Sequence, residues 1–298
     1  MVRRQGDGAE DAGDGLMGKK GLEEFEGTFG KSKIDELKAE LEVERKKVEA
    51  LAESPEPVSI KEVQGDDISF AVVSDTHFGS LYAHPNAFVA FCEYVVSRGI
   101  DTMYIAGDVI DGHGIYKGQE FELRDVGLDA QIDRLVAVCK PIAKLGLNNS
   151  FITGNHDMSF KKLVGVNVGA LIEETTGWRH IGDEQGDIVY KTKAGDYKVR
   201  LLHPGGGSSY ALSYRPQKII ESLEGGSKPN MICIGHYHKA MVMPSYRNMT
   251  AILAGTFQKQ TPFMARGALA AHVGGWVIAV GVGKGSNRIM PEFVAFYK

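Results

Sequence analysis

The segment ISFAVVSDTH, residues 68–77, decides the fold class of this chain. It is a short apolar run rich in Val that ends in polar residues, which is typical of a buried strand followed by a polar loop. Four later runs have the same character: DTMYIAGD (101–108), NNSFITGN (148–155), YKVRLLH (197–203) and MICIGH (231–236). Because ligands of α/β sheets bind outside the carboxyl ends of strands, five strands can deliver polar residues to one point.

The polar residues at these strand ends form short motifs. They are Asp75-Thr-His77, Gly107-Asp108-Val-Ile-Asp111, Gly154-Asn155-His156-Asp157, a lone His203, and Gly235-His236-Tyr-His238. Carboxylate oxygen suits hard divalent ions and imidazole suits zinc, iron and related ions, so this mixed set predicts a pair of transition-metal ions. Two such ions activate a water and stabilise both oxygens of a phosphoryl displacement.

In this order, the motifs resemble those of the calcineurin-like metallophosphoesterase superfamily over about residues 68 to 260. The resemblance implies an α/β fold with two packed mixed β-sheets flanked by α-helices, a four-layer αββα sandwich. It also implies the metal ligands. These are Asp75, His77 and His238 for one ion, Asn155, His203 and His236 for the other, and Asp108 as the bridge between them.

The same resemblance implies that His156 is the general acid or phosphate-orienting group and that Asp111 holds its imidazole. Near two cations the imidazolium form of His156 is disfavoured unless a carboxylate compensates. An Asp–His pair that faces the leaving group therefore fits a general acid. Two interpretations of Asp157 stay open: a cap of the following turn through a backbone N–H, or a contact to the metal shell.

Two stretches narrow the choice within the superfamily. Serine/threonine phosphatases carry Arg directly after the second Asp, where this chain has Gly112, so we do not expect that branch. GHGIYKGQE (112–120) and AGTFQKQTPF (254–263) resemble the small, exonuclease-type subunit of archaeal D-family DNA polymerase. SDTHFGS (74–80) resembles repair exonucleases of the Mre and SbcD type. Residues 1–66 are too few for an OB-fold region ahead of the catalytic domain, so we expect a free-standing phosphoesterase.

These features predict a cytoplasmic metallophosphoesterase that hydrolyses phosphodiester bonds as a DNA 3′–5′ exonuclease. We expect two divalent ions, with Mn²⁺ favoured and Fe, Zn or Ni compatible with the same ligands. Two alternatives stay open: a phosphomonoesterase or small-nucleotide phosphodiesterase, and a non-catalytic scaffold subunit of a replication or repair complex. His113, Tyr116 and Tyr237 are candidate substrate contacts because they lie beside the motifs, and tyrosines can stack on bases.

The net charge of −4 lacks the basic signature usual for DNA-binding proteins, although a metal pair supplies local positive potential. Several basic residues in or near the motif loops either line a phosphate-backbone groove or belong to a mixed surface. They are Lys117, Arg124, Lys161, Lys162, Arg215, Lys218, Lys239 and Lys259.

The N-terminal region has a different composition. Residues 1–31 are rich in Gly and charged residues and are predicted to be disordered. Residues 32–54 predict a charged helix whose apolar residues have heptad spacing. It forms either a short coiled coil, for self-association or a protein partner, or a solvated helix laced with Glu–Lys pairs. Residues 55–66, with two prolines, predict an extended linker, and residues 67–298 the catalytic domain.

The three cysteines, Cys92, Cys139 and Cys233, lie in apolar surroundings without paired spacing. They predict core residues in a reducing compartment. No apolar stretch has the length of a membrane span and the first residues lack an apolar signal core, so we expect no membrane contact. Apolar spacing predicts helices at 84–99, 128–146, 166–177 and 213–226, and strands from residue 240 onward.

Overall fold

The structure is a computed structural model that describes residues 58–297 together with residues 35, 36, 39 and 42. The chain divides into two units, Met1–Pro55 and Glu56–Lys298. The four described residues of the first unit are helical and exposed. The predicted tail (1–31) and the rest of the predicted charged helix (32–54) lie outside the described residues.

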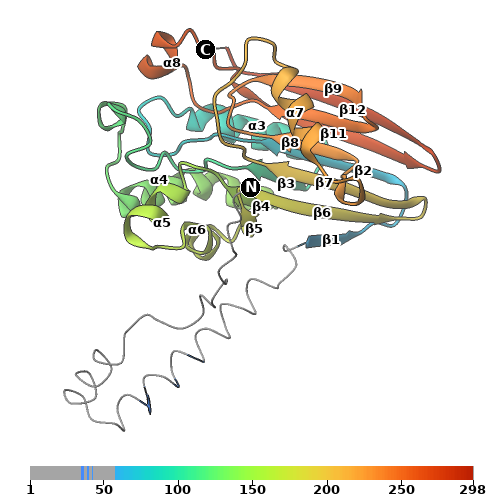
Figure 1. Cartoon of the computed structure of the whole chain (residues 1–298), viewed down its shortest axis with the longest axis horizontal. Helices are drawn as coiled ribbons and strands as arrows, with labels where there is room; N and C mark the ends of the chain where they lie inside the picture. The colour runs from blue at the N-terminus through green and yellow to red at the C-terminus, as the bar shows by residue number, and fades with distance from the viewer. Residues whose placement is uncertain (1–34, 37–38, 40–41, 43–57, 298) are drawn as a thin grey trace, which may run out of the picture. The chain divides into compact units, whose positions relative to one another are not determined.

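Two mixed sheets form the second unit (Figure 1). The first contains β2 (Asp67–Val73), β3 (Thr102–Ala106), β4 (Asn148–Thr153), β5 (Arg179–Asp183), β11 (Gly274–Gly283) and β12 (Ser286–Ala295). The second contains β1 (Val58–Glu62), β6 (Gln185–Thr192), β7 (Gly195–Leu202), β8 (Met231–Ile234), β9 (Ala240–Tyr246) and β10 (Met249–Ala254). The strand orders are β12-β11-β2-β3-β4-β5 and β1-β6-β7-β8-β10-β9.

Helices cover the outer faces of the sheets. The α-helices are α3 (Pro85–Ser97), α4 (Leu128–Ile142), α5 (Met158–Val164), α6 (Val168–Thr176), α7 (Tyr214–Ser222) and α8 (Pro262–Arg266). Short 3₁₀ turns lie at Gln119–Phe121, Ala143–Leu145 and Gly225–Ser227. Apolar residues of α3, α4 and α6 share one core with the first sheet, and α7 shares another with the second.

The alternation of side chains along β2 explains the layers, because successive residues of a strand point to opposite faces. Phe70 and Val72 belong to the cluster between the two sheets, which also contains Tyr197 of β7. Ala71 and Val73 belong to the cluster beneath the helices of the first sheet. The predicted four-layer αββα arrangement is therefore confirmed.

Most predicted elements are present. The four predicted helices correspond to α3, α4, α6 and α7, and the predicted C-terminal strands to β9 through β12. The three cysteines are free and buried, as predicted. The predicted linker (55–66) differs: residues 58–62 are extended, but they form β1, which pairs in parallel with β6. The edge of β6 offers backbone partners to an extended segment, and the sequence pattern of that segment alone does not show this.

The strand directions fix where the motifs meet. β2, β3 and β4 run parallel to one another in the first sheet, and β7 and β8 run parallel in the second. Their carboxyl ends therefore lie at the same edge of each sheet, and the loops that follow carry all the predicted ligands. Among the described residues, no helix combines the length and apolar character needed to cross a membrane.

Candidate metal centre

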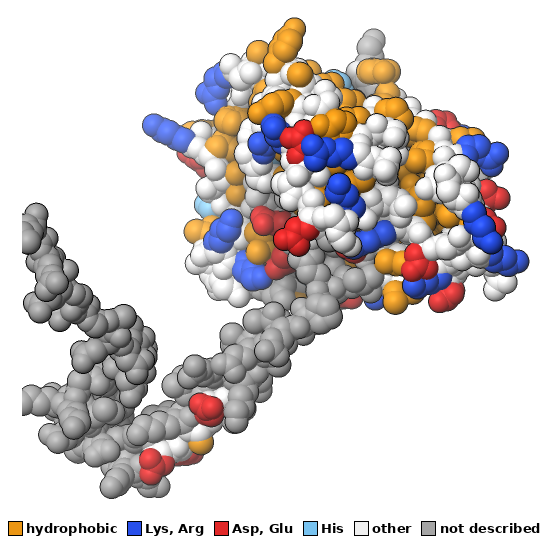
Figure 2. All heavy atoms as spheres, turned by 45° about the vertical axis from the view of Figure 1, so that its right-hand side comes forward, with side chains coloured by type: hydrophobic (Ala, Val, Ile, Leu, Met, Phe, Trp, Pro, Cys, Tyr) orange, Lys and Arg blue, Asp and Glu red, His pale blue; other side chains and the backbone are white. Residues whose placement is uncertain are grey.

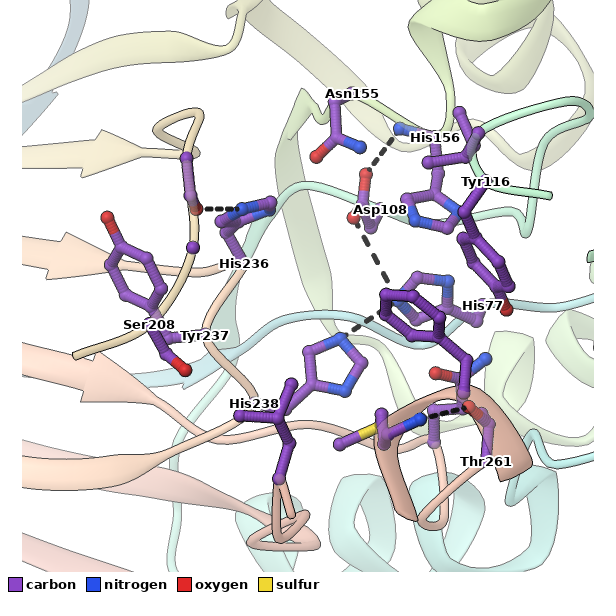
Figure 3. A pocket seen from close by; sticks show the side chains of 17 residues that line it. His77, Asp108, Tyr116, Asn155, His156, Ser208, His236, Tyr237, His238 and Thr261 are labelled. Carbon is purple, nitrogen blue, oxygen red and sulfur yellow. Dashed lines mark hydrogen bonds and ion pairs between the residues drawn. The ribbon is translucent and has the colours of Figure 1, made fainter. Parts of the chain in front are cut away.

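The five strand-end loops bring the predicted ligands into one cluster, and Figure 3 shows five of them: His77, Asp108, Asn155, His236 and His238. Asp75, His77 and His238 place one donor atom each within 4.8 Å of one another, and Asp108, His203 and His236 do the same. Asn155 lies beside the second group, with its Oδ1 3.2 Å from Nε2 of His203. Asp75 and Asp108 are buried, as are His77 and His203.

Backbone conformation sets these residues apart. Asp75, His77, Asp108, His236 and His238 all have φ between 45° and 74°, a region that non-glycine residues rarely occupy. They make up five of the nine described non-glycine residues with positive φ. Such strain costs free energy and persists where surrounding contacts hold it in place, commonly at ligand sites. The loops therefore hold their side chains in the cluster against local preference.

Two glycines make room for the donors. At Gly107, where φ is +89°, an added Cβ would lie 2.3 Å from Nδ1 of His203. At Gly154 it would lie 2.2 Å from Oδ1 of Asp108. Each of these glycines comes directly before one predicted ligand and lies against another. A side chain at either position would collide with that second ligand.

We expect Gly154→Ala to weaken Mn²⁺ binding by about ten- to hundredfold, the usual cost of displacing a group that supports a metal ligand. The added methyl group has to push the Asp108 carboxylate out of the cluster. Calorimetric titration with Mn²⁺ measures the change. Gly65→Ala is the matched control, because no atom lies within 4 Å of its added Cβ. Equal affinities in the two variants would argue that Asp108 takes no part in binding.

In the first donor group two imidazoles face each other. Nε2 of His77 lies 3.2 Å from Nε2 of His238, which lies 3.2 Å from Oδ1 of Asp75. Nδ1 of His77 donates to the Asp111 carboxylate at 2.9 Å, so Nε2 is the nitrogen directed into the group. An imidazole oriented through its other nitrogen in this way is typical of a metal-binding histidine.

The second donor group has the same design. Nδ1 of His203 donates to the carbonyl oxygen of Ala106 at 2.7 Å, and Nε2 lies 3.0 Å from Oδ2 of Asp108. Nε2 of His236 donates to the Gly206 carbonyl at 2.7 Å, which leaves its Nδ1 as the free donor atom. Asp108 lies between the groups, since the same Oδ2 is 3.8 Å from Nε2 of His77. This donor chemistry fits a pair of divalent ions.

The electrostatics point the same way. Burial disfavours the charged forms, yet the neighbouring histidines hold the pKa of Asp75 and of Asp108 below their usual range. Burial alone would lower the pKa values of His77 and His203. The carboxylates oppose this: Asp111 and Asp75 raise the pKa of His77 to about 10, and Asp108 raises the pKa of His203 to about 9. Two buried carboxylates thus attract positive charge, which favours cations in their midst.

Asp111 holds His156 differently from the prediction. We predicted that its side chain holds the imidazole, but Oδ1 of Asp111 lies 4.0 Å from Nδ1 of His156 and accepts from His77 instead. Nδ1 of His156 donates to the backbone carbonyl of Asp111 at 2.6 Å. The His156 ring packs edge-on against the His77 ring, with centroids 4.5 Å apart, and its Nδ1 bonds to the backbone carbonyl of Asp111 rather than to the carboxylate. Asp111 therefore orients both histidines: its carboxylate holds His77 and its carbonyl holds His156.

Asp157 has neither of the roles considered for it. Its carboxylate accepts from the backbone N–H groups of Gly154, Val109 and Ile110, at 2.8, 3.2 and 2.9 Å. It makes no side-chain cap of α5 and belongs to neither donor group. Burial and the nearby charge of Asp108 raise its pKa to about 7. The residue ties the loop after β3 to the loop after β4.

A cavity of about 380 Å³ opens over the cluster. His156, Tyr116 and Tyr237 line it, and Figure 3 shows the two tyrosines on opposite sides of the histidines. His113 does not line it. None of the predicted basic residues lines it either, and the face in Figure 2 carries Lys and Arg scattered among acidic and apolar side chains.

Several residues of the site were not predicted. Gln258 lines the cavity and donates through Nε2 to Oδ1 of Asp111 at 3.2 Å. Gln119 donates to the Asp111 carbonyl at 2.8 Å. Phe263 forms part of the cavity wall. All three lie in the stretches 112–120 and 254–263 that the sequence singles out, but no spacing rule connects them to the metal motifs.

Known proteins resemble the chain in sequence. The sequence profile of the calcineurin-like phosphoesterase family matches residues 68–240, more than half of the chain. The DNA polymerase II small subunit of Methanocaldococcus jannaschii is 27% identical over 246 residues, which cover 67% of this chain and 40% of that protein. The subunit from Methanothermobacter thermautotrophicus is 31% identical over 104 residues, 31% of this chain and 21% of that one. The chain thus spans two fifths or less of these relatives.

Among solved structures, GAP50 of Plasmodium matches with a TM-score of 0.46 and 12% identity, over 77% of this chain and 84% of that one. A predicted phosphoesterase of Streptococcus pneumoniae matches with a TM-score of 0.35 and 12% identity, over 76% and 98%. The extent of the profile match, together with the five ordered motifs at strand ends, decides the family. This chain belongs to the calcineurin-like phosphoesterase family.

Proposed function

We propose that this protein is a two-metal phosphodiesterase that degrades DNA from its 3′ end. The observation that carries the proposal is the complete donor set beside an open cavity, with the inward-facing nitrogen of His77, His203 and His236 set by hydrogen bonds. Asp75, His77 and His238 would hold one ion, Asn155, His203 and His236 would hold the other, and Asp108 would be shared between them. Mn²⁺ is the proposed metal, and Fe, Zn or Ni suit the same ligands.

Bound divalent ions supply an activated water and neutralise charge on the phosphate. The chain's own residues position the reaction. His156 lines the cavity with Nδ1 committed to the Asp111 carbonyl, so Nε2 is the atom placed to hold or move a proton at the leaving oxygen. Asp111 is a positioning residue for His77 and His156, and Gln119 and Gln258 hold Asp111 in turn.

The choice of DNA rests on two supports. The relatives with recognisable sequence similarity are named as small subunits of a DNA polymerase. The stretches 112–120 and 254–263, which carry the predicted resemblance to such subunits, both contribute residues to the cavity. The intact donor set supports catalysis over the scaffold alternative, because every predicted ligand is present in the cluster. The three buried free thiols suit a reducing cytoplasm.

Hydrolysis of DNA by the purified protein tests the proposal. A 5′-labelled oligonucleotide is incubated with Mn²⁺ beside the small diester bis-p-nitrophenyl phosphate, and an oligonucleotide with 3′-terminal phosphorothioate linkages is run in parallel. We expect a ladder that shortens from the 3′ end, and strong retardation by the phosphorothioates. Asp108→Asn protein controls for contaminating nucleases. Cleavage of the small diester with intact DNA would replace DNA by a small phosphate ester as substrate. Hydrolysis of neither would favour a scaffold.

A further inference from the structure

One wall of the cavity has no part in the proposed metal chemistry. Five residues form it: Ile115, Tyr116, Phe263, Met264 and Leu269. None of them carries a charge, whereas the floor consists of carboxylate, amide and imidazole groups. A phosphate alone needs no such wall. Its presence indicates that an apolar part of the substrate lies beside the reacting phosphate.

Two flat rings dominate this wall. Tyr116 and Phe263 stack with centroids 4.2 Å apart and ring planes at 23°. They come from segments nearly 150 residues apart in sequence: Tyr116 from the loop after β3 and Phe263 from α8. Phe263 keeps 42% of its surface exposed although it is fully apolar. The pair therefore presents an open aromatic face beside the donor cluster.

The buried carboxylate of Glu122 fixes this stack. One oxygen accepts the hydroxyl proton of Tyr116 at 2.7 Å, and the other accepts the backbone N–H of Phe263 at 2.9 Å. Glu122 is only 4% exposed, and burial of a carboxylate is costly unless its hydrogen bonds are made. Thr261 caps the short helix that carries Phe263 by accepting from the N–H of Met264 at 3.2 Å. The rings are thus held in place before any substrate arrives.

We propose that the Tyr116–Phe263 stack, oriented by Glu122, is the subsite for the base of the nucleotide whose phosphate lies at the metal centre. This inference rests on the proposed function and adds the substrate class: a nucleotide unit, recognised by stacking. Every nucleobase has a π-face, so the subsite accepts all of them, as an exonuclease requires. No Lys or Arg among the described residues lines the cavity, so recognition of a polyphosphate finds no support there.

Tyr237 on the opposite side is a poorer stacking surface. Arg215 lies over its ring, 5.7 Å from the centroid, and donates to its hydroxyl at 3.0 Å. Tyr237 is only 7% exposed. Arg215 also donates to the carbonyl of Gly205, beside the Gly206 carbonyl that holds His236. Tyr237 therefore supports the loop over the second donor group.

The test compares two diesters with the same leaving group. One is the p-nitrophenyl ester of thymidine 5′-monophosphate, and the other is methyl p-nitrophenyl phosphate, which has no base. We expect Phe263→Ala to lower the ratio of kcat/KM for the nucleotide diester to that for the methyl diester about tenfold, in the range that removal of a base-stacking ring causes. Phe263→Leu keeps an apolar side chain of similar bulk and should lower the same ratio.

Phe121→Ala is the matched control, because Phe121 lies in the same loop as Tyr116, is 81% exposed and does not line the cavity. This variant should leave the ratio of kcat/KM values unchanged.

Calorimetric binding of thymidine 5′-monophosphate and of inorganic phosphate gives a readout without turnover. An unchanged ratio in Phe263→Ala, or equal loss on both diesters, overturns the base subsite. If the wild type hydrolyses neither diester, the proposed function fails. The base subsite then stands only if Phe263→Ala still weakens the binding of thymidine 5′-monophosphate more than the binding of inorganic phosphate.

Discussion

Asp108→Asn should reduce metal-dependent hydrolysis by at least about a thousandfold, the largest effect we expect from a single substitution. Asp108 lies between the two donor groups, with Oδ2 3.0 Å from Nε2 of His203 and 3.8 Å from Nε2 of His77. Asparagine keeps the size of the side chain but removes the negative charge that offsets repulsion between two cations. We therefore expect fewer than two ions per chain after dialysis.

Metal content by mass spectrometry and the rate on bis-p-nitrophenyl phosphate measure this prediction together. Thermal unfolding shows whether the fold survives. Asp196→Asn removes a carboxylate from the exposed start of β7 and should change neither metal content nor rate. An Asp108→Asn protein that keeps both ions and the wild-type rate would mean that this carboxylate is not the bridge.

His156→Ala should slow turnover by about a hundred- to ten-thousandfold while the metal content stays at the wild-type value. The ring lines the cavity, and its Nδ1 is committed to the Asp111 carbonyl rather than to either of the two donor groups at the floor. Loss of a proton-transfer group lowers kcat, whereas loss of a ligand lowers metal affinity. The two measurements therefore separate the roles.

A competing assignment makes this variant informative. His156 also lies with His77 and Asp111 in a third set of close donor atoms. If His156→Ala lost metal as completely as Asp108→Asn, His156 would be a ligand and our assignment would be wrong. His180→Asn controls for the removal of an imidazole, because this residue lies on β5 and does not line the cavity. We expect wild-type kcat and metal content for it.

The strand ends and the order of the motifs could be predicted from the sequence, because both depend on short stretches of neighbouring residues. The alternation in β2 places Phe70 and Val72 on one face and Ala71 and Val73 on the other, and each motif begins where an apolar run stops. Parallel strands then bring their carboxyl ends together without further information. The resemblance carried by the ordered motifs implied the αββα fold and the ligand set, and the structure brings these residues into one cluster.

Contacts between residues of different loops could not be predicted from the sequence, because they depend on which atoms come together after folding. Asp111 gives its carboxylate to His77 and its carbonyl to His156, and the spacing of GDxxD specifies neither contact. Asp157 ties two loops through backbone N–H groups, a role that no motif encodes. The same holds for β1, whose residues are extended by sequence but become a strand only because β6 offers an edge.

Apolar periodicity and the polar residue types at strand ends thus predicted the strands and a mixed set of metal-binding side chains, and the resemblance carried by the ordered motifs implied the layers, the family and the individual ligands. Which nitrogen of His77, His203 and His236 faces the donor cluster depends on the acceptor that the other nitrogen meets, so it is fixed only when the chain has folded. The same holds for the surface formed by Tyr116 and Phe263, because Glu122 joins two segments that are distant in the chain.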